Sequence, residues 1–330
     1  MKTNVIVTGG AGFIGSCLCK VLAQKNFNPV TVDNLSTGYR QLVKFGDFVE
    51  ADFGDYEKMV EVFKKFKPLA IFHIAGSKSV EESMRDPHKY FLNNVSKTNE
   101  LLKATVDCGI ENFIFSSTAV IFEESESISE NSPKKPKNNY GLSKLIAEQL
   151  IESYGKAHDL KFSLLRYFNV TGADPDLEVG EITTKPANIF PILCKIASEK
   201  ISDFTIFGED YETHDGTCIR DYIHVHDIAK AHLLALEKMI QNKSSFSANL
   251  GNGRGFSVKE VSSMFRKVSG SNFKIIIGEK RSGDPTNLVA NIDFAQKYLG
   301  WKPKFSNLED QINHSWSWHQ KTFYDTSNKN

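Results

Sequence analysis

Short apolar runs alternate with amphipathic stretches through the first half of the chain. The runs have the length of buried strands and fall at residues 5–8, 30–33, 48–52, 70–74, 113–117 and 162–167. Helical periodicity occupies residues 13–24, 56–65, 90–108 and 140–158 between them. Regular alternation of strands and helices predicts an α/β fold, a Rossmann-type doubly wound parallel sheet covered by helices on both faces.

The pattern changes near Thr171. Turn-forming residues follow at 172–176, and a long irregular stretch comes next. Helices are predicted at 189–198, from an N-cap at Asp227 to about 240, and at 258–268. The chain is thus expected to form a Rossmann domain at 1–169 and, mainly, a smaller C-terminal α/β substrate lobe at 170–330. Segments near 221–250 are expected to pack back onto the large sheet.

Composition excludes several classes of function. The chain has 330 residues, is 40% hydrophobic and 24% charged, and carries a formal net charge of +0. That balance argues against a nucleic-acid partner. No apolar run approaches the roughly 20 residues needed to cross a bilayer. Its five cysteines show no Cys-x-x-Cys spacing, and a strand pattern begins almost at the first residue, so we expect a cytoplasmic protein without a signal peptide.

A glycine-rich turn joins the first strand to the first helix. Gly9 is expected to let the chain turn sharply, Gly12 to let the backbone approach a pyrophosphate, and Gly15 to let the helix pack closely. The helix N-terminus then offers free N–H groups to the phosphates. Asp33 ends the next strand, where a carboxylate accepts hydrogen bonds from the ribose hydroxyls and repels a 2′-phosphate. The prediction is NAD and not NADP.

A second motif supplies candidate chemistry. Tyr140 and Lys144 are four residues apart and share one face of a predicted helix. A phenol is a weak base at neutral pH, but a nearby ammonium together with a positive nicotinamide ring would favour its phenolate. Thr118 follows a strand at the carboxyl end of the sheet, where its hydroxyl could bridge substrate and Tyr140.

These motifs resemble the extended short-chain dehydrogenase/reductases. Stretches that narrow the resemblance to the UDP-glucose 4-epimerases are 32–36, 165–169, 172–175, 207–211, 215–217 and 219–225. The likeness runs from the first residue to about Trp318. It implies that Tyr140 takes the proton of the sugar 4-OH while C4 gives its hydride to NAD⁺. The 4-keto sugar then turns over and receives hydride on the opposite face, which inverts C4 of a UDP-hexose and leaves NAD bound.

The resemblance also implies site residues by position. Cofactor contacts fall at Gly9, Gly12, Phe13, Ile14, Gly15, Asp33, Asn34, Asp52, Phe53, Ile74, Ala75, Gly76, Lys78, Asn94, Ser116, Tyr140, Lys144 and Phe168. Substrate contacts fall at Lys78, Thr118, Tyr140, Asn169, Asn188, Ile189, Thr205, Phe207, Arg220, Tyr222, Arg281, Asp284 and Leu288. A guanidinium fork suits a diphosphate, which agrees with the two arginines. Relatives of this kind are often homodimers that pair through the Tyr-bearing helix and the one before it.

The chain departs from the family pattern in two places. Residues 120–123 replace the usual Val-Tyr-Gly, so packing beside the pocket is expected to change. Leu288 stands where a small residue tends to admit N-acetylated sugars and a tyrosine tends to exclude them. Because leucine is intermediate, the choice between UDP-glucose/galactose, N-acetylhexosamine and pentose substrates stays open.

Other interpretations remain. A 4,6-dehydratase, a decarboxylase or a reductase could use the same scaffold, but a dehydratase has Asp-Glu where Ala119 and Val120 stand. A non-catalytic NAD-binding protein would be free to lose the Tyr/Lys pair.

His224 and His226 share one side of a strand, but zinc needs three or four converging ligands, so no metal is expected. The acidic run at 123–130 and the basic run at 134–137 are expected to be exposed loops.

Overall fold

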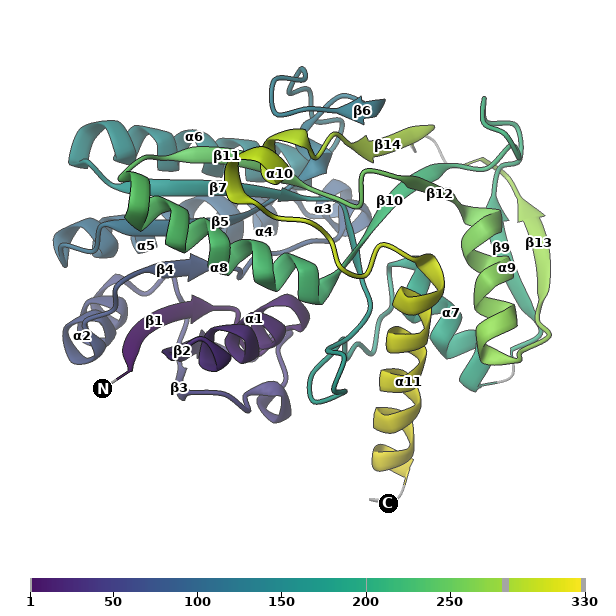
Figure 1. Ribbon diagram of the computed structural model, residues 1–330, viewed down its shortest axis with the longest axis horizontal. Coiled ribbons are helices and arrows are strands. Elements are labelled where there is room, and N and C mark those ends of the chain that lie inside the picture. Colours follow the sequence, from purple (N-terminus) through teal and green to yellow (C-terminus); the bar gives the residue numbers. More distant parts are fainter. Residues whose placement is uncertain (1, 200, 281–284, 328–330) are drawn as a thin grey trace.

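Seven parallel strands form the central sheet of the protein. The computed structural model describes residues 2–199, 201–280 and 285–327, with side chains described up to residue 322. The strand order is β11-β7-β5-β4-β1-β2-β3. The strands span β1 Thr3–Thr8, β2 Phe27–Asp33, β3 Asp47–Glu50, β4 Ile71–His73, β5 Asn112–Thr118, β7 Lys161–Tyr167 and β11 Phe246–Leu250. All their carboxyl ends therefore lie at one edge, where such folds bind ligands (Figure 1).

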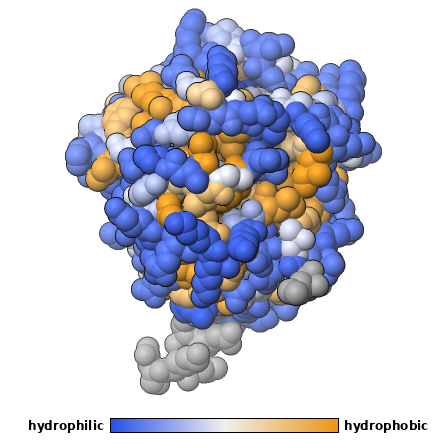
Figure 2. Space-filling view, turned by 90° about the vertical axis from the view of Figure 1, so that its left-hand side faces the viewer, coloured by the Kyte–Doolittle hydropathy of each residue, from blue (hydrophilic) through white to orange (hydrophobic). Residues whose placement is uncertain are grey.

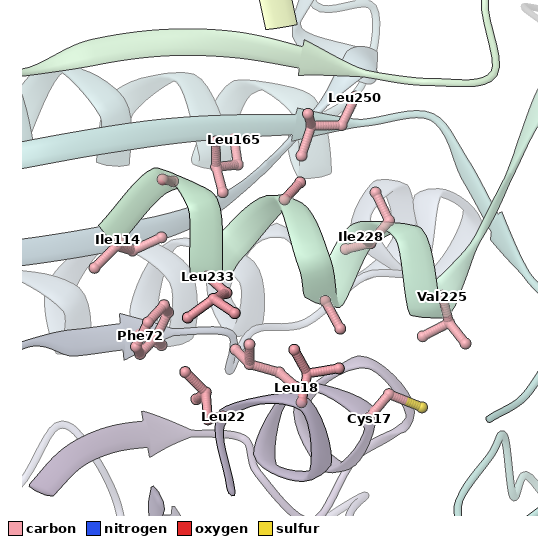
Figure 3. Packing of buried hydrophobic residues seen from close by; sticks show 14 of the residues in the cluster. Cys17, Leu18, Leu22, Phe72, Ile114, Leu165, Val225, Ile228, Leu233 and Leu250 are labelled. Carbon is pink, nitrogen blue, oxygen red and sulfur yellow. The ribbon is translucent and has the colours of Figure 1, made fainter. Parts of the chain in front are cut away.

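Helices cover both faces of this sheet, as the alternating pattern predicts. One face carries α1 (Phe13–Gln24), α8 (Val225–Asn242) and α10 (Asp293–Leu299). The other carries α2 (Tyr56–Phe66), α5 (Lys97–Asp107) and α6 (Asn139–His158). Figure 3 shows α8 lying across β4, β5 and β7, with Leu233 facing α1. A sheet buried on both sides explains its almost continuous apolar strands.

The second half of the chain builds smaller sheets beside the large one. In one of them β12, β10, β14 and β6 lie side by side, and β8 pairs with β10; β9 and β13 form a separate pair. These strands span β6 Ser125–Ile128, β8 Asn169–Thr171, β9 Asp203–Phe207, β10 Ile219–His224, β12 Gly255–Ser257, β13 Lys274–Gly278 and β14 Asn287–Ala290. Helices α7 (Ile189–Ser198), α9 (Val258–Ser269) and α11 (Leu308–Ser327) pack around a separate apolar cluster. The exact division at residues 169 and 170 stays a prediction.

Three details differ from the sequence-based expectations. The helix expected at 90–108 is α4 (Pro87–Phe91), a π-helical turn η2 (Leu92–Ser96) and α5. The N-cap of α8 is His224, because Asp227 accepts hydrogen bonds from the backbone of Lys304 and Phe305 instead. The acidic run expected as a loop contains β6, which pairs with β14 and buries Ile128.

Short elements complete the fold: η1 (Arg40–Leu42), α3 (Val80–Arg85) and η3 (Ala119–Ile121). Figure 2 shows the face on the left-hand side of Figure 1, where hydrophilic residues dominate and apolar ones gather in patches among them. Within the described residues, no helix is both long enough and apolar enough to traverse a bilayer.

Candidate active site

The glycine turn between β1 and α1 has the geometry that a dinucleotide requires. Gly9 has a positive φ of 72°, and a Cβ there would lie 2.8 Å from the Ala75 backbone. A Cβ on Gly15 would lie 2.2 Å from the Gly9 carbonyl oxygen, so only glycine lets α1 start this close to the turn. At Gly12 a Cβ would meet nothing nearer than 3.3 Å.

The open side of Gly12 is the place where a ligand can approach the backbone. Gly12 is also the N-cap of α1, and its end of the helix receives no side-chain cap. The free N–H groups of this first turn and the positive end of the helix dipole suit a pyrophosphate. The residues present therefore fit a dinucleotide cofactor.

Asp33 ends β2 beside this turn, as expected. Its carboxylate accepts hydrogen bonds from the backbone N–H of Ala11 at 3.0 Å and of Leu35 at 2.9 Å. Burial raises the pKa of Asp33, and these two N–H groups work against that rise. Two backbone donors thus hold the carboxylate at the position where ribose hydroxyls would lie.

The segment after β3 offers a second acidic position. Asp52 accepts from the Asn34 amide at 3.1 Å and pairs with Lys97 at 2.5 Å. Burial raises the pKa of Asp52, but the bond from Lys97 outweighs it and leaves the pKa lowered. The next residue, Phe53, is buried with its ring 4.8 Å from the His73 ring. The carboxylate and the aromatic ring lie close to the turn, as an adenosine site requires.

Tyr140 and Thr118 lie side by side at the carboxyl end of β5. Their hydroxyls share a hydrogen bond, and Thr118 also accepts from the backbone N–H of Val120 at 3.2 Å. Gly141 makes this approach possible, because a Cβ there would lie 2.6 Å from the Val120 carbonyl oxygen. Tyr90 packs edge-on against the Tyr140 ring at 6.3 Å. Strand, turn and helix together therefore fix the position of the phenol.

Burial acts on the pKa of both Tyr140 and Lys144, and in each case it opposes the phenolate and ammonium that the sequence suggests. Burial raises the pKa of the Tyr140 phenol, and the Thr118 hydrogen bond only partly opposes that rise. Lys144 is 4% exposed, and burial lowers its pKa to about 7. Its ammonium lies over the Phe115 ring, 4.1 Å from the centroid. The protein surroundings alone thus do not produce a phenolate, and further positive charge is needed to favour it.

Asn94 lies in the π-helical turn and anchors the segment that follows β4. Its side-chain oxygen accepts from the Ser77 N–H at 2.8 Å, and its amide donates to the Ser77 carbonyl and the Ser143 hydroxyl. A Cβ on Gly76 would lie 3.2 Å from the Asn94 oxygen and 3.6 Å from the Lys144 nitrogen. The helical irregularity turns Asn94 toward the site, a use common for π turns.

The expected substrate residues come from the smaller sheets. Arg220 and Leu288 are register partners on β10 and β14, and Leu288 packs with Phe168 in one apolar cluster. Asn188 is the N-cap of α7, but its side chain accepts no hydrogen bond from the first turn, whereas Phe207 is 38% exposed at the end of β9. The elements that carry these residues, β10, β14, α7 and β9, lie on the side of the molecule toward which the strands of the large sheet point (Figure 1).

Several expected positions need separate mention. Tyr222 is 2% exposed and packs on Phe190 at 5.5 Å, so it belongs to the core. Lys78 pairs with Glu181 at 3.4 Å, which links the segment after β4 to the loop before α7. Arg281 and Asp284 lie outside the described residues. The other expected residues lie in or next to the elements already described: Phe13, Ile14, Ile74, Ser116, Asn169, Ile189 and Thr205.

One acidic group among the described side chains has the spacing of a metal site. It consists of Asp174, Asp176 and Glu178. The Lys20 ammonium lies 2.6 Å from a carboxylate oxygen of each, so a side-chain cation already occupies the place among the three carboxylates. His224 bonds to His314 at 2.9 Å and, within the described residues, belongs to no cluster with metal-ligand spacing.

Sequence reasoning missed the polar residues beneath the site. His73 bridges the hydroxyls of Thr8 and Thr98 at 2.7 and 3.0 Å, and Thr98 donates to the Asn94 carbonyl. Glu148, which lies on α6 with Tyr140 and Lys144, forms an ion pair with Arg166. The one available signal was the four-residue spacing from Lys144 to Glu148, which places both on one helix face.

The fold and the site define a class: a dinucleotide-binding enzyme with a Tyr-x-x-x-Lys pair at the carboxyl edge of a Rossmann sheet. The model of the NAD dependent epimerase/dehydratase family matches residues 5–251. The chain belongs to this family.

Curated and solved relatives cover almost the whole chain. The UDP-glucose 4-epimerase of Rhizobium meliloti (strain 1021) is 41% identical over 322 residues, or 97% of this chain and 98% of the relative. The UDP-glucose 4-epimerase of Brucella ovis, solved in complex with NAD, is 41% identical with a TM-score of 0.92 over 96% and 98% of the two chains. That of Stenotrophomonas maltophila, with NAD and formylated UDP-arabinopyranose, is 35% identical with a TM-score of 0.94 over 98% and 99%.

Proposed function

We propose that this protein is an NAD-dependent epimerase that inverts C4 of a UDP-hexose through a transient 4-keto sugar. The observation that carries the proposal is the hydrogen-bonded Tyr140–Thr118 pair beside Lys144, at the edge where the glycine turn would hold a dinucleotide. Epimerase relatives that match nearly the full chain support it.

Each residue then has a defined task. Tyr140 is the base that takes the 4-OH proton and later returns it, and Thr118 hydrogen-bonds both the phenol and the sugar hydroxyl. Lys144 holds the nicotinamide ribose through its ammonium, and Asp33 receives the hydroxyls of the adenosine ribose. Arg220 and Arg281 bind the diphosphate of the sugar nucleotide. When bound, NAD⁺ supplies the hydride acceptor, and its positive ring favours the Tyr140 phenolate.

No net oxidation occurs over the proposed cycle. Tyr140 takes the O–H proton as C4 becomes a ketone, and bound NAD⁺ would accept the hydride of the C4–H bond. The 4-keto sugar turns within the pocket while its nucleotide stays bound. The hydride would return to the opposite face of C4, and Tyr140 returns the proton to O4. Because the cofactor would be regenerated in each cycle, it has no need to leave.

The structure argues for epimerisation over dehydration on the same scaffold. Ala119 and Val120 form the turn after Thr118, and neither side chain can exchange a proton. Leu288 lies 8% exposed beside Phe168 and contributes a wall of intermediate size. Because the relatives that match nearly the whole chain are UDP-glucose 4-epimerases, we assign UDP-glucose and UDP-galactose as the preferred pair, with UDP-N-acetylhexosamines and UDP-pentoses as the alternatives.

The proposal extends to organisation and location. Residues 1–169 are assigned to the NAD-binding domain and 170–330 mainly to the sugar-nucleotide lobe, although β11 joins the large sheet. A homodimer is supported by exposed apolar side chains on α3, η2 and α6, namely Val80, Met84, Leu92 and Leu142. The cysteines are free, which suits a reducing cytoplasm. The neutral net charge argues against a nucleic-acid partner.

The test is a product assay with the Tyr140→Phe variant. The unmodified protein should convert UDP-galactose into UDP-glucose without stoichiometric release of NADH. Tyr140→Phe removes the proton acceptor and should lower kcat by about 10²–10⁴-fold while the purified protein retains its NAD. Release of one NADH per sugar would instead indicate a dehydrogenase, and an active Tyr140→Phe variant would exclude Tyr140 as the base.

A further inference from the structure

A buried ion pair lies directly beneath the reacting groups. Glu148 on α6 and Arg166 on β7 have side chains only 1% and 2% exposed. The guanidinium donates to both carboxylate oxygens, each at 2.9 Å. The Ser117 hydroxyl donates to the same carboxylate at 2.6 Å, and Lys134 approaches it at 3.4 Å. Every oxygen of Glu148 is therefore satisfied by a donor from another element.

Stability alone is a poor explanation for this arrangement. Removing two charges from water costs several kcal/mol per ion, and apolar replacement of such a pair is often neutral or stabilising. The pair borders apolar side chains, since the Phe122 ring lies 5.3 Å from the Arg166 guanidinium. Its location next to the site suggests a role in the reaction.

The contacts of Glu148 join the two halves of the catalytic pair. Ser117 immediately precedes Thr118 on β5, and Lys144 is one helical turn before Glu148 on α6. A single carboxylate thus connects the strand that carries the hydroxyl to the helix that carries the phenol. A rotation or slide of α6 that separated Tyr140 from Thr118 would also break the bonds to Ser117 and Arg166.

We propose that Glu148 is a positioning residue for the epimerase reaction: it locks α6 onto β5 and β7, and it places a carboxylate one helical turn from Lys144. This inference rests on the proposed function. It adds a residue that acts through Tyr140, Thr118 and Lys144 without touching the substrate.

The surroundings of Lys144 offer little else to hold its charge. Among the described residues, the His73 ring from β4 and the Phe115 ring from β5 lie near it, and Asn94 of η2 and Lys144 both lie beside Gly76. Burial and the Lys144 charge hold the pKa of His73 well below its usual value, so that ring is neutral. The Arg166 charge from β7 is matched by Glu148 itself.

The sign of the expected change follows from these charges. Burial lowers the pKa of Lys144 to about 7, and Glu148 opposes that fall. Loss of the carboxylate charge therefore lowers this pKa further and leaves Arg166 uncompensated nearby. The state in which Lys144 is protonated and Tyr140 is ionised is then less populated. As the pH rises, this state is lost at a lower pH than in the unmodified protein.

The experiment measures kcat against pH for Glu148→Gln in the NAD-loaded protein. We expect kcat at the optimum to fall about tenfold or more, because the phenol is no longer held in place. The alkaline limb should move down by about one pH unit. Glu148→Asp keeps the charge and shortens the reach, so it should lower kcat and move the limb less. Bound NAD should be retained in both variants.

Controls separate the possible failures. Glu152→Gln changes the same charge one turn further along α6. Among the described residues, no hydrogen bond or ion pair joins Glu152 to the site, so this variant should match the unmodified protein. If Glu148→Gln does not fold, Glu148→Gln with Arg166→Met removes the unpaired cation, and its limb should still move down. An alkaline limb unchanged in these variants, with kcat reduced or not, would overturn the inference. Absence of epimerase activity in the unmodified protein would instead refute the proposed function.

Discussion

Tyr140 depends on its neighbours for its proposed chemistry. Burial raises the pKa of Tyr140 and the hydrogen bond with Thr118 opposes that rise, so the phenol needs further positive charge before it can accept a proton. The sequence identified Tyr140, Lys144 and Thr118 from their spacing. The effect of burial on both titratable groups could not be predicted, because solvent exposure depends on residues distant in sequence, such as Phe115 and Tyr90.

The size of residue 288 bears on substrate choice in the proposed site. Leu288 forms one apolar cluster with Phe168 and Ile121, and in that site its size would set the room beside the sugar. Leu288→Ser should raise kcat/KM for UDP-N-acetylglucosamine relative to UDP-glucose by about tenfold, and Leu288→Tyr should lower that ratio. The measurement is steady-state kinetics on both sugars, with UDP-glucose turnover as the internal control. If the ratio of the two kcat/KM values were the same in both variants, the N-acetyl group would not lie beside residue 288.

The glycine turn and α1 show how an element can be predicted in detail. The bounds of α1 at Phe13 and Gln24 follow from periodicity and from the glycines before it. By contrast, the π-helical turn at Leu92–Ser96 interrupts a helix that the apolar pattern predicts to be regular. The deviation depends on tertiary contacts, since Asn94 bonds to Ser77 and Ser143.

Two glycine substitutions in this turn should separate folding from binding. A methyl group at Gly15 would lie 2.2 Å from the Gly9 oxygen, so Gly15→Ala should cost about 1–3 kcal/mol of stability. Gly12→Ala has room within the protein, with its nearest neighbour at 3.3 Å, and should keep its Tm in the absence of cofactor. Both variants should lose bound NAD. The measurements are thermal unfolding after cofactor removal and NAD content after denaturation; an NAD-loaded Gly12→Ala variant would contradict the assigned turn.

At the scale of the whole molecule, the proposed site draws on two groups of strands. The large sheet carries most of the expected cofactor residues, and β9, β10 and β14 carry several of the expected sugar-nucleotide residues (Figure 1). The chain returns from the second group to the first through α8 and β11. This return ties the two parts together, which a rigid grip on cofactor and substrate requires.

Assembly into a dimer can be tested at the exposed apolar patch. Leu92 is 45% exposed on η2, which contacts α6, so Leu92→Glu should place a charge in the proposed interface. The variant should be a monomer by light scattering, whereas the unmodified protein should have twice the chain mass. Ile240→Glu is the matched control, since Ile240 is 44% exposed on α8, outside the patch. A dimeric Leu92→Glu variant would argue for a different interface.

The sequence by itself determined the α/β class and most of the strands and helices, and it predicted the dinucleotide turn and the Tyr/Lys/Thr set. Such features depend on local periodicity, on glycine conformations and on residues only a few positions apart. Tertiary structure alone decided the π-helical turn, the role of Asp227, the burial of Tyr222 and the Glu148–Arg166 pair. Each of these arises where segments distant in the chain meet, and the desolvation and hydrogen-bond partners found there are not encoded in any local pattern.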